Sequence, residues 1–318
     1  MNQVPPPRPT GTPPGDPFAA QRLLKPTGPI DVVFDSDTYN EIDDQYALAY
    51  MLRSTEKLRV QALYAAPFAW APRADTPRDG MEKSYQEMKH VLSLIDRRDL
   101  FPLLHRGAEH FLQSETEPAV SDAARDLARR AMAYTPDAPL YVIAIVAITN
   151  IASAILLNPD IVDRIVVVWL GGNGLDWPDN HEFNLSQDIA AARVVFGSGA
   201  TLVMLPCGGV VSEFAVSRQE LLRRLQGKNA LCDYLLQETL ACLERQSDPP
   251  ACAKVLWDVT AVAWLLDGAF TEDRLEHAPI PGYDRQWRFD PARHMVRYVY
   301  QINRENLLDD LFRKLAEE

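Results

Sequence analysis

Five acidic side chains crowd one short stretch of this chain, between residues 35 and 44. Asp35 and Asp37 follow an apolar run that predicts a buried strand, whereas Glu41, Asp43 and Asp44 lead into a helical pattern, with no Lys or Arg among them. Two carboxylates about 4 Å apart repel by roughly 4 kcal/mol at an effective dielectric constant of about 20. A cation bound among them removes that repulsion, and open α/β sheets place ligands at the carboxyl ends of strands. The turn therefore predicts a metal-dependent active site.

Acidic residues in the first turn of a helix also have a structural explanation. Asp43 and Asp44 would each gain about 0.3–1 kcal/mol from the helix dipole. That explanation does not extend to Asp35 and Asp37, because both precede the helix. A metal site therefore explains more of the cluster.

Composition narrows the class of protein and of partner. The 318 residues are 47% hydrophobic, which suffices for one large α/β domain or two smaller ones. The net charge of −12 argues against nucleic acid or an anionic membrane as a partner and favours a small molecule. No apolar run approaches the roughly 20 residues of a membrane span, and the first residues lack the apolar centre of a secretory signal. We expect a cytoplasmic protein.

Strand and helix patterns alternate along the chain after a start that is rich in Pro and Gly. We predict a disordered arm over residues 1–28 and one catalytic domain over residues 29–318. The continuous apolar run 140–147 is typical of a parallel strand that is covered on both faces. A long loop is expected over 67–81, and helices over much of 217–266. The alternation predicts a single doubly wound α/β domain, with a mostly parallel, Rossmann-like sheet and additional helices.

Three further segments complete a family likeness. Ala147-Ile148-Thr149-Asn150-Ile151-Ala152 follows a predicted buried strand, His181-Glu182-Phe183-Asn184 lies in the loop after a Gly-Gly strand end, and Trp257-Asp258 opens an apolar helix. In this order and at these separations, together with the acidic turn, they resemble the inosine–uridine-type nucleoside hydrolases. Those enzymes cleave the N-glycosidic bond of ribonucleosides. The likeness runs from about residue 30 to the C-terminus and implies the doubly wound fold of that family.

The resemblance implies a tightly held Ca²⁺ ion at the floor of a pocket. Its ligands would be the side chains of Asp37, Asp44 and Asp258 and the main-chain carbonyl of Ile145. Calcium takes about six to eight oxygen ligands, so carboxylates, a carbonyl, waters and sugar hydroxyls form a suitable set. The alternative for Asp258 is a helix cap or a solvated acid. An unpaired charge among its apolar neighbours would be costly, which favours metal ligation.

The same resemblance places five residues at the substrate. Asp43 would hold the ribose 2′-hydroxyl, and Glu182 and Asn184 would contact the ribose hydroxyls. Asn40 of the acidic turn belongs to the same site, and Trp257 would stack on the base. Loop polarity is the structural alternative for Glu182 and Asn184, with Asn184 capping the next helix. Core packing is the alternative for Trp257.

The implied reaction is hydrolysis of a ribonucleoside to ribose and free base. Calcium would orient a water molecule and lower its pKa, and Asp37 would accept the proton of that water. Contacts from the ribose hydroxyls to the metal and to Asp43 would fix the anomeric carbon beside the water. Carboxylates would stabilise the positive charge of an oxocarbenium-like transition state. We also expect a homo-oligomer, either a dimer or a tetramer.

The chain departs from the best-known family pattern in three places. The acidic turn is longer than the usual Pro-Gly spacer over residues 38–42, and the second strand ends at 64–68 without the Asn that the family often places near the ribose. Trp257 stands where pyrimidine-accepting members have a His that helps the base to leave. Purine-specific relatives stack a Trp on the base at this position. These differences bear on base specificity and suggest a preference for purine nucleosides.

Two other interpretations of the same residues stay open at this point. Asp35, Asp37 and Thr38 after a strand also fit the Asp-x-Asp-x-Thr motif of haloacid-dehalogenase-like phosphatases, with Asp35 as nucleophile and magnesium as cation. That family needs a later Lys and a second acidic motif, and residues 174–179 are only a loose match. Alternatively, the chain is a non-catalytic nucleoside- or sugar-binding protein that kept the metal site without turnover.

Overall fold

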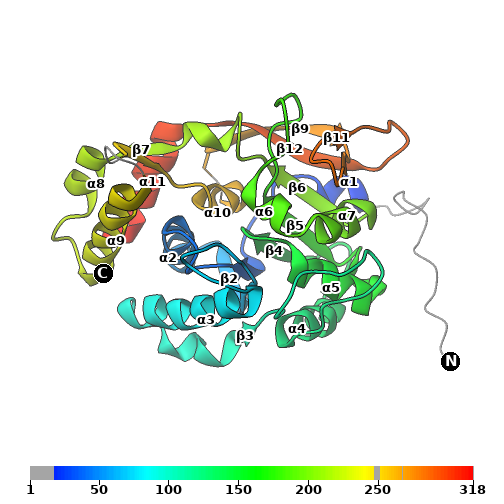
Figure 1. Ribbon diagram of the computed structural model, residues 1–318, viewed down its shortest axis with the longest axis horizontal. Coiled ribbons are helices and arrows are strands. Elements are labelled where there is room, and N and C mark those ends of the chain that lie inside the picture. The colour runs from blue at the N-terminus through cyan, green and yellow to red at the C-terminus, as the bar shows by residue number, and fades with distance from the viewer. Residues whose placement is uncertain (1–17, 247–250, 267, 318) are drawn as a thin grey trace.

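An eight-stranded sheet forms the centre of the molecule (Figure 1). The computed structural model describes residues 18–246, 251–266 and 268–317. In the order of the sheet, its strands are β3 (Leu104–Arg106), β2 (Leu58–Ala65), β1 (Ile30–Ser36), β4 (Leu140–Ala144), β5 (Ile165–Leu170), β6 (Thr201–Leu205), β12 (Met295–Ile302) and β9 (Thr271–His277). Neighbouring strands run parallel, except that β9 lies antiparallel to β12 at one edge.

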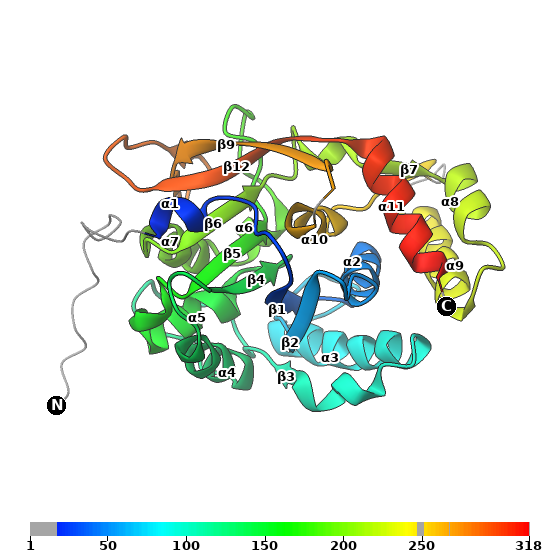
Figure 2. The same cartoon turned by 180° about the vertical axis from the view of Figure 1, so that it is seen from behind.

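Helices cover both faces of this sheet, as the two opposite views show (Figures 1 and 2). The core on one face includes residues of α2 (Asp43–Leu52), α3 (Pro77–Leu94), α8 (Arg218–Leu225), α9 (Ala230–Gln246), α10 (Val259–Leu265) and α11 (Arg304–Ala316). The core on the other face includes residues of α4 (Asp122–Arg130), α5 (Thr149–Leu157) and α7 (Ile189–Gly197). The prediction of a doubly wound, mostly parallel α/β sheet with additional helices is confirmed.

Smaller elements connect these layers. They are α1 (Ala19–Arg22), α6 (Phe183–Gln187), the short strand pairs β7 (Ala215–Ser217) with β8 (Ala253–Val255) and β10 (Ile280–Pro281) with β11 (Trp287–Arg288), and the 3-10 turns Arg98–Leu103, Ala131–Ala133, Pro159–Ile161 and Val211–Glu213. Within the described residues, the structure contains no helix that is both long enough and apolar enough to cross a bilayer.

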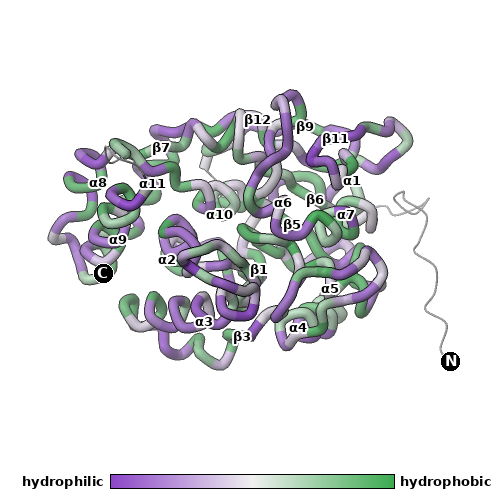
Figure 3. Tube along the Cα trace, in the orientation of Figure 1, coloured by the Kyte–Doolittle hydropathy of each residue, from purple (hydrophilic) through white to green (hydrophobic). Residues whose placement is uncertain are grey.

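The central strands are apolar along their whole length because both of their faces are covered. Along β4, Val142 packs into the core of one face and Ile143 into the core of the other. The same alternation places Val167 and Val168 of β5 on opposite faces. Figure 3 shows this centre as a largely hydrophobic region of the trace. A strand that is buried on both faces reads as an uninterrupted apolar run, as the sequence indicated.

Two boundaries differ from the predictions. The strand expected over 140–147 ends at Ala144, because the chain leaves the sheet and begins the turn into α5. The loop expected over 67–81 is shorter, because α3 begins at Pro77. There the Thr76 side chain caps the helix by accepting a hydrogen bond from the Asp79 N–H, and Pro is well suited to the first helical position.

The predicted arm over residues 1–28 lies only partly within the described structure, because residues 1–17 fall outside it. Residues 18–28 include α1, and the buried guanidinium of Arg22 donates hydrogen bonds to Oγ1 of Thr201 at 3.1 Å and to the carbonyl of Pro136 at 3.2 Å. This part of the chain is therefore anchored to the sheet rather than disordered.

The order of the strands marks one position in the sheet as special. From β1 the chain continues to β2 and β3 on one side, whereas β4, β5 and β6 follow on the other side. The connections at the carboxyl ends of β1 and β4 therefore diverge and leave a crevice between them. The acidic turn follows β1 and Ile145 follows β4, so both face this crevice.

Candidate active site

A cleft of about 400 Å³ opens at this crevice, and all nine site residues expected from the sequence line it. They are Asp37, Asn40, Asp43, Asp44, Ile145, Glu182, Asn184, Trp257 and Asp258. These residues come from four segments that are far apart in the chain. The segments after β1 and β4 meet at the ends of parallel strands, whereas Trp257 and Asp258 follow β8, which lies outside the main sheet. The structure therefore brings the expected site residues together in one cleft. The role of each residue stays a prediction.

Hydrogen bonds inside the acidic turn hold its carboxylates in place. Ser36 Oγ, at the end of β1, donates to Oδ1 of Asp44 across 2.6 Å. Asn40 Nδ2 donates to Oδ2 of Asp37 across 3.2 Å, and the Asn40 N–H donates to the Asp37 carbonyl across 2.7 Å. The turn then enters α2 at Asp43, which sets Asp43 and Asp44 in the first helical turn.

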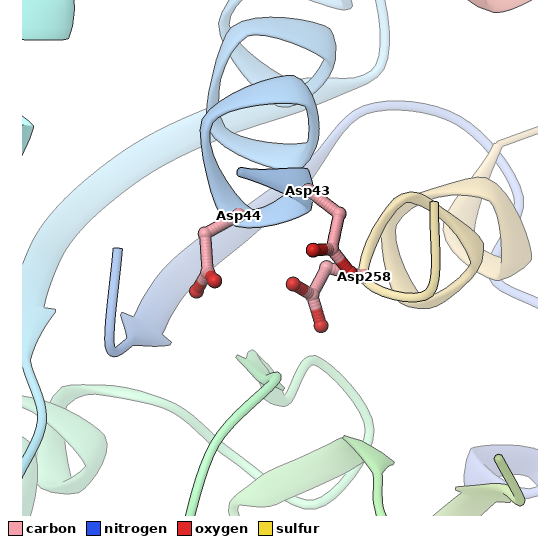
Figure 4. Close-up of side chains that lie close together, drawn as sticks. All are labelled: Asp43, Asp44 and Asp258. Atoms are coloured by element: carbon pink, nitrogen blue, oxygen red, sulfur yellow. The ribbon is translucent and has the colours of Figure 1, made fainter. Parts of the chain in front are cut away.

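Three buried carboxylates converge at the beginning of two helices (Figure 4). Asp43 and Asp44 begin α2, Asp258 immediately precedes α10, and one oxygen of each lies within 4.8 Å of the others. Burial, and then the charge of Asp43, raise the pKa of Asp44 to about 7. Burial, and then the charge of Asp44, raise the pKa of Asp258 well above its ordinary value. The cluster therefore favours either bound protons or a bound cation.

Asp37 lies beside this group of three rather than within it. Burial, followed by the charge of Asp44, raises the pKa of Asp37 well above its ordinary value. On the other side, Ile145 lines the cleft just after β4, and its N–H donates to the Asp35 carbonyl across 3.0 Å. Carboxylate and carbonyl oxygens are the donors that a hard cation such as Ca²⁺ prefers, so this set of residues fits calcium.

A buried lysine behind the cleft could not have been anticipated from the acidic turn. Lys254, in β8, has only 2% of its side chain exposed. Its Nζ lies 2.6 Å from Oε2 of Glu41 and 3.0 Å from Oδ1 of Asp43. Burial raises the pKa of Asp43, and the charge of Lys254 opposes that rise. The sequence gives no local signal for this contact, because more than two hundred residues separate the partners.

Glu182 and Asn184 have structural partners as well as a place in the cleft. Glu182 caps α6, and its carboxylate accepts hydrogen bonds from the N–H groups of Asn184, Leu185 and Gly172 at 2.7–2.8 Å. Asn184 Nδ2 donates to the Leu170 carbonyl across 3.1 Å. Capping was the alternative for Asn184, but the structure places Asn184 inside α6 and Glu182 at the cap. The cap orients the Glu182 carboxylate without removing it from the cleft.

Aromatic side chains also line the cleft. Trp257 packs partly against the core and also lines the cleft, so core packing is observed and stacking on a base stays a prediction. Trp70 and Phe183, which the sequence analysis did not single out, line it too, with ring centroids 6.1 Å apart. Trp70 is 45% exposed, in a loop with no recognisable motif, which explains why it was missed.

The loop that carries Trp70 is fastened to the acidic turn. Arg73 Nε donates to the carbonyls of Tyr39 and Asn40 at 3.0 and 3.2 Å, and its guanidinium lies 4.2 Å from the centre of the Tyr39 ring. Trp70 and Ala74 close the loop, because the Trp70 N–H donates to the Ala74 carbonyl across 3.0 Å. The loop therefore holds Trp70 at the mouth of the cleft.

The family assignment comes from the sequence as a whole. The family model of the inosine-uridine preferring nucleoside hydrolases matches residues 32–308. The chain belongs to this family. The match confirms the resemblance and the expectation of an N-glycosyl hydrolase that acts on ribonucleosides. No curated protein matches the chain in sequence.

Solved structures share the nucleoside hydrolase fold over nearly the whole chain. A plant nucleoside hydrolase is 20% identical, with 91% of this chain and 100% of that chain covered and a TM-score of 0.72. The purine-preferring ribonucleoside hydrolase from Gardnerella vaginalis is 17% identical, with 90% and 98% covered and a TM-score of 0.68. An effector protein is 18% identical, with 95% and 98% covered and a TM-score of 0.67. At these identities the similarity establishes the fold alone.

The phosphatase interpretation does not fit this nucleoside hydrolase cleft. Asp35, its nucleophile, is fully buried at the end of β1 and does not line the cleft. Oδ1 of Asp35 accepts a hydrogen bond of 2.8 Å from Nδ2 of Asn150, and burial raises the pKa of Asp35 to about 7. Asn150 of the Thr-Asn-Ile segment therefore supports the strand end that carries the acidic turn, and Asp35 cannot reach a phosphate ester.

Proposed function

We propose that the chain hydrolyses purine ribonucleosides to ribose and free base, with a calcium ion held by Asp37, Asp44, Asp258 and the Ile145 carbonyl. The observation that carries this proposal is the convergence of Asp43, Asp44 and Asp258 in the cleft of a nucleoside hydrolase fold. Their buried, mutually repelling charges need compensation, and their oxygen donors suit calcium. When bound, the ion supplies positive charge that keeps the carboxylates ionised and polarises water and hydroxyl groups.

Asp37 is the proposed general base. It lines the cleft beside the group of three carboxylates, and Asn40 orients its carboxylate, so a water molecule held there can donate a proton to it. Asp37 would accept a proton from the water that attacks the anomeric carbon. Asp43 would accept a hydrogen bond from the ribose 2′-hydroxyl, and Asn40, Glu182 and Asn184 would hold the rest of the sugar. The surrounding carboxylates would stabilise positive charge on the sugar as the base departs.

The charges of the cleft favour a neutral substrate. Six carboxylates line it, and none of its described lining residues is Lys or Arg. A nucleoside 5′-phosphate would bring two negative charges toward these carboxylates, which disfavours its binding. The substrate class that fits best is therefore a free nucleoside rather than a nucleotide.

The aromatic side chains that line the cleft support a preference for purines. Trp70, Phe183 and Trp257 offer flat apolar surfaces beside the carboxylates. A purine has a larger stacking surface than a pyrimidine. An indole also cannot protonate a pyrimidine leaving group at neutral pH, because its N–H only donates hydrogen bonds.

A reducing-sugar assay over a panel of nucleosides tests the proposal directly. Inosine, guanosine and adenosine should be hydrolysed faster than uridine and cytidine, and inosine 5′-phosphate should be a poor substrate. Chelation of calcium should abolish turnover, and added calcium should restore it. Ribose binding in a calorimeter without hydrolysis of any nucleoside would instead identify a non-catalytic binding protein. A dimer or tetramer and a cytoplasmic location stay predictions, which sedimentation and cell fractionation can test.

A further inference from the structure

Lys254 supplies a positive charge directly behind the carboxylates of the cleft. Its Nζ contacts Asp43 at 3.0 Å and Glu41 at 2.6 Å, and both of these carboxylates line the cleft. Lys254 itself is not among the residues that line the cleft. Lys254 therefore contacts a bound sugar only indirectly, through the two carboxylates that it holds.

The backbone around Lys254 is fixed by its neighbours. β8 pairs antiparallel with β7, so that Lys254 lies opposite Val216, and the Leu256 N–H then donates to the Phe214 carbonyl across 3.1 Å. Asp258 follows four residues after Lys254 in the same segment. One short piece of backbone thus brings both a cation and an anion to the carboxylate cluster.

The pairing of Lys254 with two carboxylates satisfies an otherwise costly burial. An ammonium group loses its hydration when it is buried, and it needs charged partners and hydrogen bonds in return. The ion pair to Oδ1 of Asp43 also restricts rotation of the carboxylate, because turning it would separate the charges. Glu41 holds the other side of the ammonium and so limits the movement of Lys254.

We propose that Lys254 is a positioning residue that fixes the Asp43 carboxylate toward the ribose 2′-hydroxyl, and that Glu41 keeps Lys254 in place. This inference rests on the proposed function, in which Asp43 accepts the hydrogen bond of that hydroxyl. It makes Lys254 a determinant of the discrimination between ribonucleosides and 2′-deoxyribonucleosides. A lysine that only compensates charge would affect both classes of substrate alike.

The test compares substrates within one variant. In Lys254→Met, kcat/KM for inosine should fall about 10- to 100-fold, the range expected when a hydrogen bond to a charged group is lost. The kcat/KM for 2′-deoxyinosine should change much less. The ratio of kcat/KM for inosine to that for 2′-deoxyinosine should therefore fall. The ratio of inosine to 3′-deoxyinosine should stay close to that of the wild type. An unchanged ratio of inosine to 2′-deoxyinosine would overturn the inference.

Three further variants separate positioning from folding. Lys254→Arg keeps the charge and should retain most of the discrimination. The double variant Glu41→Gln/Lys254→Met also removes the charge of one of the two carboxylates that contact Lys254, and it replaces the single variant if that one does not fold. Lys314→Met is the matched control, because Lys314 is a buried lysine that pairs with Glu56 at 2.5 Å, outside the cleft. It should alter stability and leave the substrate ratio unchanged.

The proposed function and this inference fail in different ways. If the wild-type protein hydrolyses no nucleoside, the proposed function is wrong and the substrate ratio has no meaning. If the wild type hydrolyses inosine and Lys254→Met lowers kcat/KM equally for inosine and 2′-deoxyinosine, the proposed function stands. Lys254 then has a purely structural role.

Discussion

Asn40 donates a hydrogen bond from Nδ2 to Oδ2 of Asp37 across 3.2 Å, and both side chains line the cleft. The other end of the same amide, Oδ1 of Asn40, is buried and has no hydrogen-bond partner among the described residues. A buried oxygen without a partner costs free energy that a ligand hydroxyl would recover. Asn40 therefore combines two properties, since it orients Asp37 and leaves an acceptor available to a substrate.

Asp37→Asn tests the proposed general base with little change of shape. Turnover of inosine should fall by at least about 100-fold, the low end for loss of a general base. Asn40→Ala should have a smaller effect, because Asp37 keeps its carboxylate and loses only one hydrogen bond. Initial rates at saturating inosine measure both effects. Near-normal turnover of Asp37→Asn would remove Asp37 from the chemistry.

Calcium should stabilise the fold through the acidic cluster. At a free calcium concentration about 100 times the dissociation constant, binding adds roughly 2.7 kcal/mol to the free energy of unfolding. Differential scanning fluorimetry of chelator-treated protein should show Tm rise with added calcium. Asp44→Ala should remove that rise while the fold survives. The proposed site would be contradicted if the Tm of the wild type does not change with calcium. It would also be contradicted if the Tm of Asp44→Ala rises with calcium as that of the wild type does.

The sequence predicted those parts of the site that lie next to a recognisable strand or helix in the chain. The acidic turn, the Glu182–Asn184 segment and the Trp257–Asp258 pair each follow or precede a recognisable element. The ends of parallel strands bring the segments after β1 and β4 together, whereas the Trp257–Asp258 pair follows β8, outside the main sheet. Lys254 and Trp70 were missed because neither has a local motif. Lys254 contacts Asp43 from a distant segment without lining the cleft, and Trp70 lines the cleft from a loop.

Local chemistry also explains where the predicted boundaries were wrong. Apolar continuity extended the strand that ends at Ala144 by three residues, because the turn after it is as buried as the strand itself. At α3 the periodicity of the apolar residues indicated a late beginning. The capping hydroxyl of Thr76 and the proline at the first helical position set an earlier one.

His294 should make the protein less stable at mildly acidic pH. Its ring is buried, neither ring nitrogen has a hydrogen-bond partner among the described residues, and burial lowers its pKa to about 4. The unfolded chain, with an ordinary pKa near 6.5, binds more protons between about pH 6.5 and 4, so the free energy of unfolding falls as the pH falls through this window. The contribution lost between pH 7.5 and pH 5 is about 2 kcal/mol.

The effect of His294 is measured as a difference between two proteins. Buried Asp35 has a raised pKa and acts in the opposite direction, so the total pH dependence of the wild type does not isolate the histidine. Urea unfolding of the wild type and of His294→Phe at several pH values provides the comparison. The wild type should lose stability relative to the variant as the pH falls. Parallel curves for the two proteins would show that His294 does not titrate in this range.

Trp257 should determine the preference of the enzyme for purine over pyrimidine nucleosides. Stacking of a base on an aromatic side chain is worth about 1–3 kcal/mol, so Trp257→Ala should lower kcat/KM for inosine by about 5- to 150-fold. The pyrimidine base of uridine has a smaller stacking surface, so kcat/KM for uridine should fall less. Trp70→Ala should act in the same direction, since Trp70 lines the same cleft. Trp177→Ala, a change at an exposed Trp that does not line the cleft, is the control.

Trp257→His distinguishes stacking from help to the leaving group. An imidazole can donate a proton near neutral pH, whereas an indole cannot. The variant should therefore hydrolyse inosine more slowly than the wild type does. It should hydrolyse uridine faster than Trp257→Ala does, and this gain should disappear above the pKa of the histidine. If the wild type hydrolyses uridine as well as inosine, or if Trp257→Ala has unchanged kinetics, then Trp257 serves only the core against which it packs.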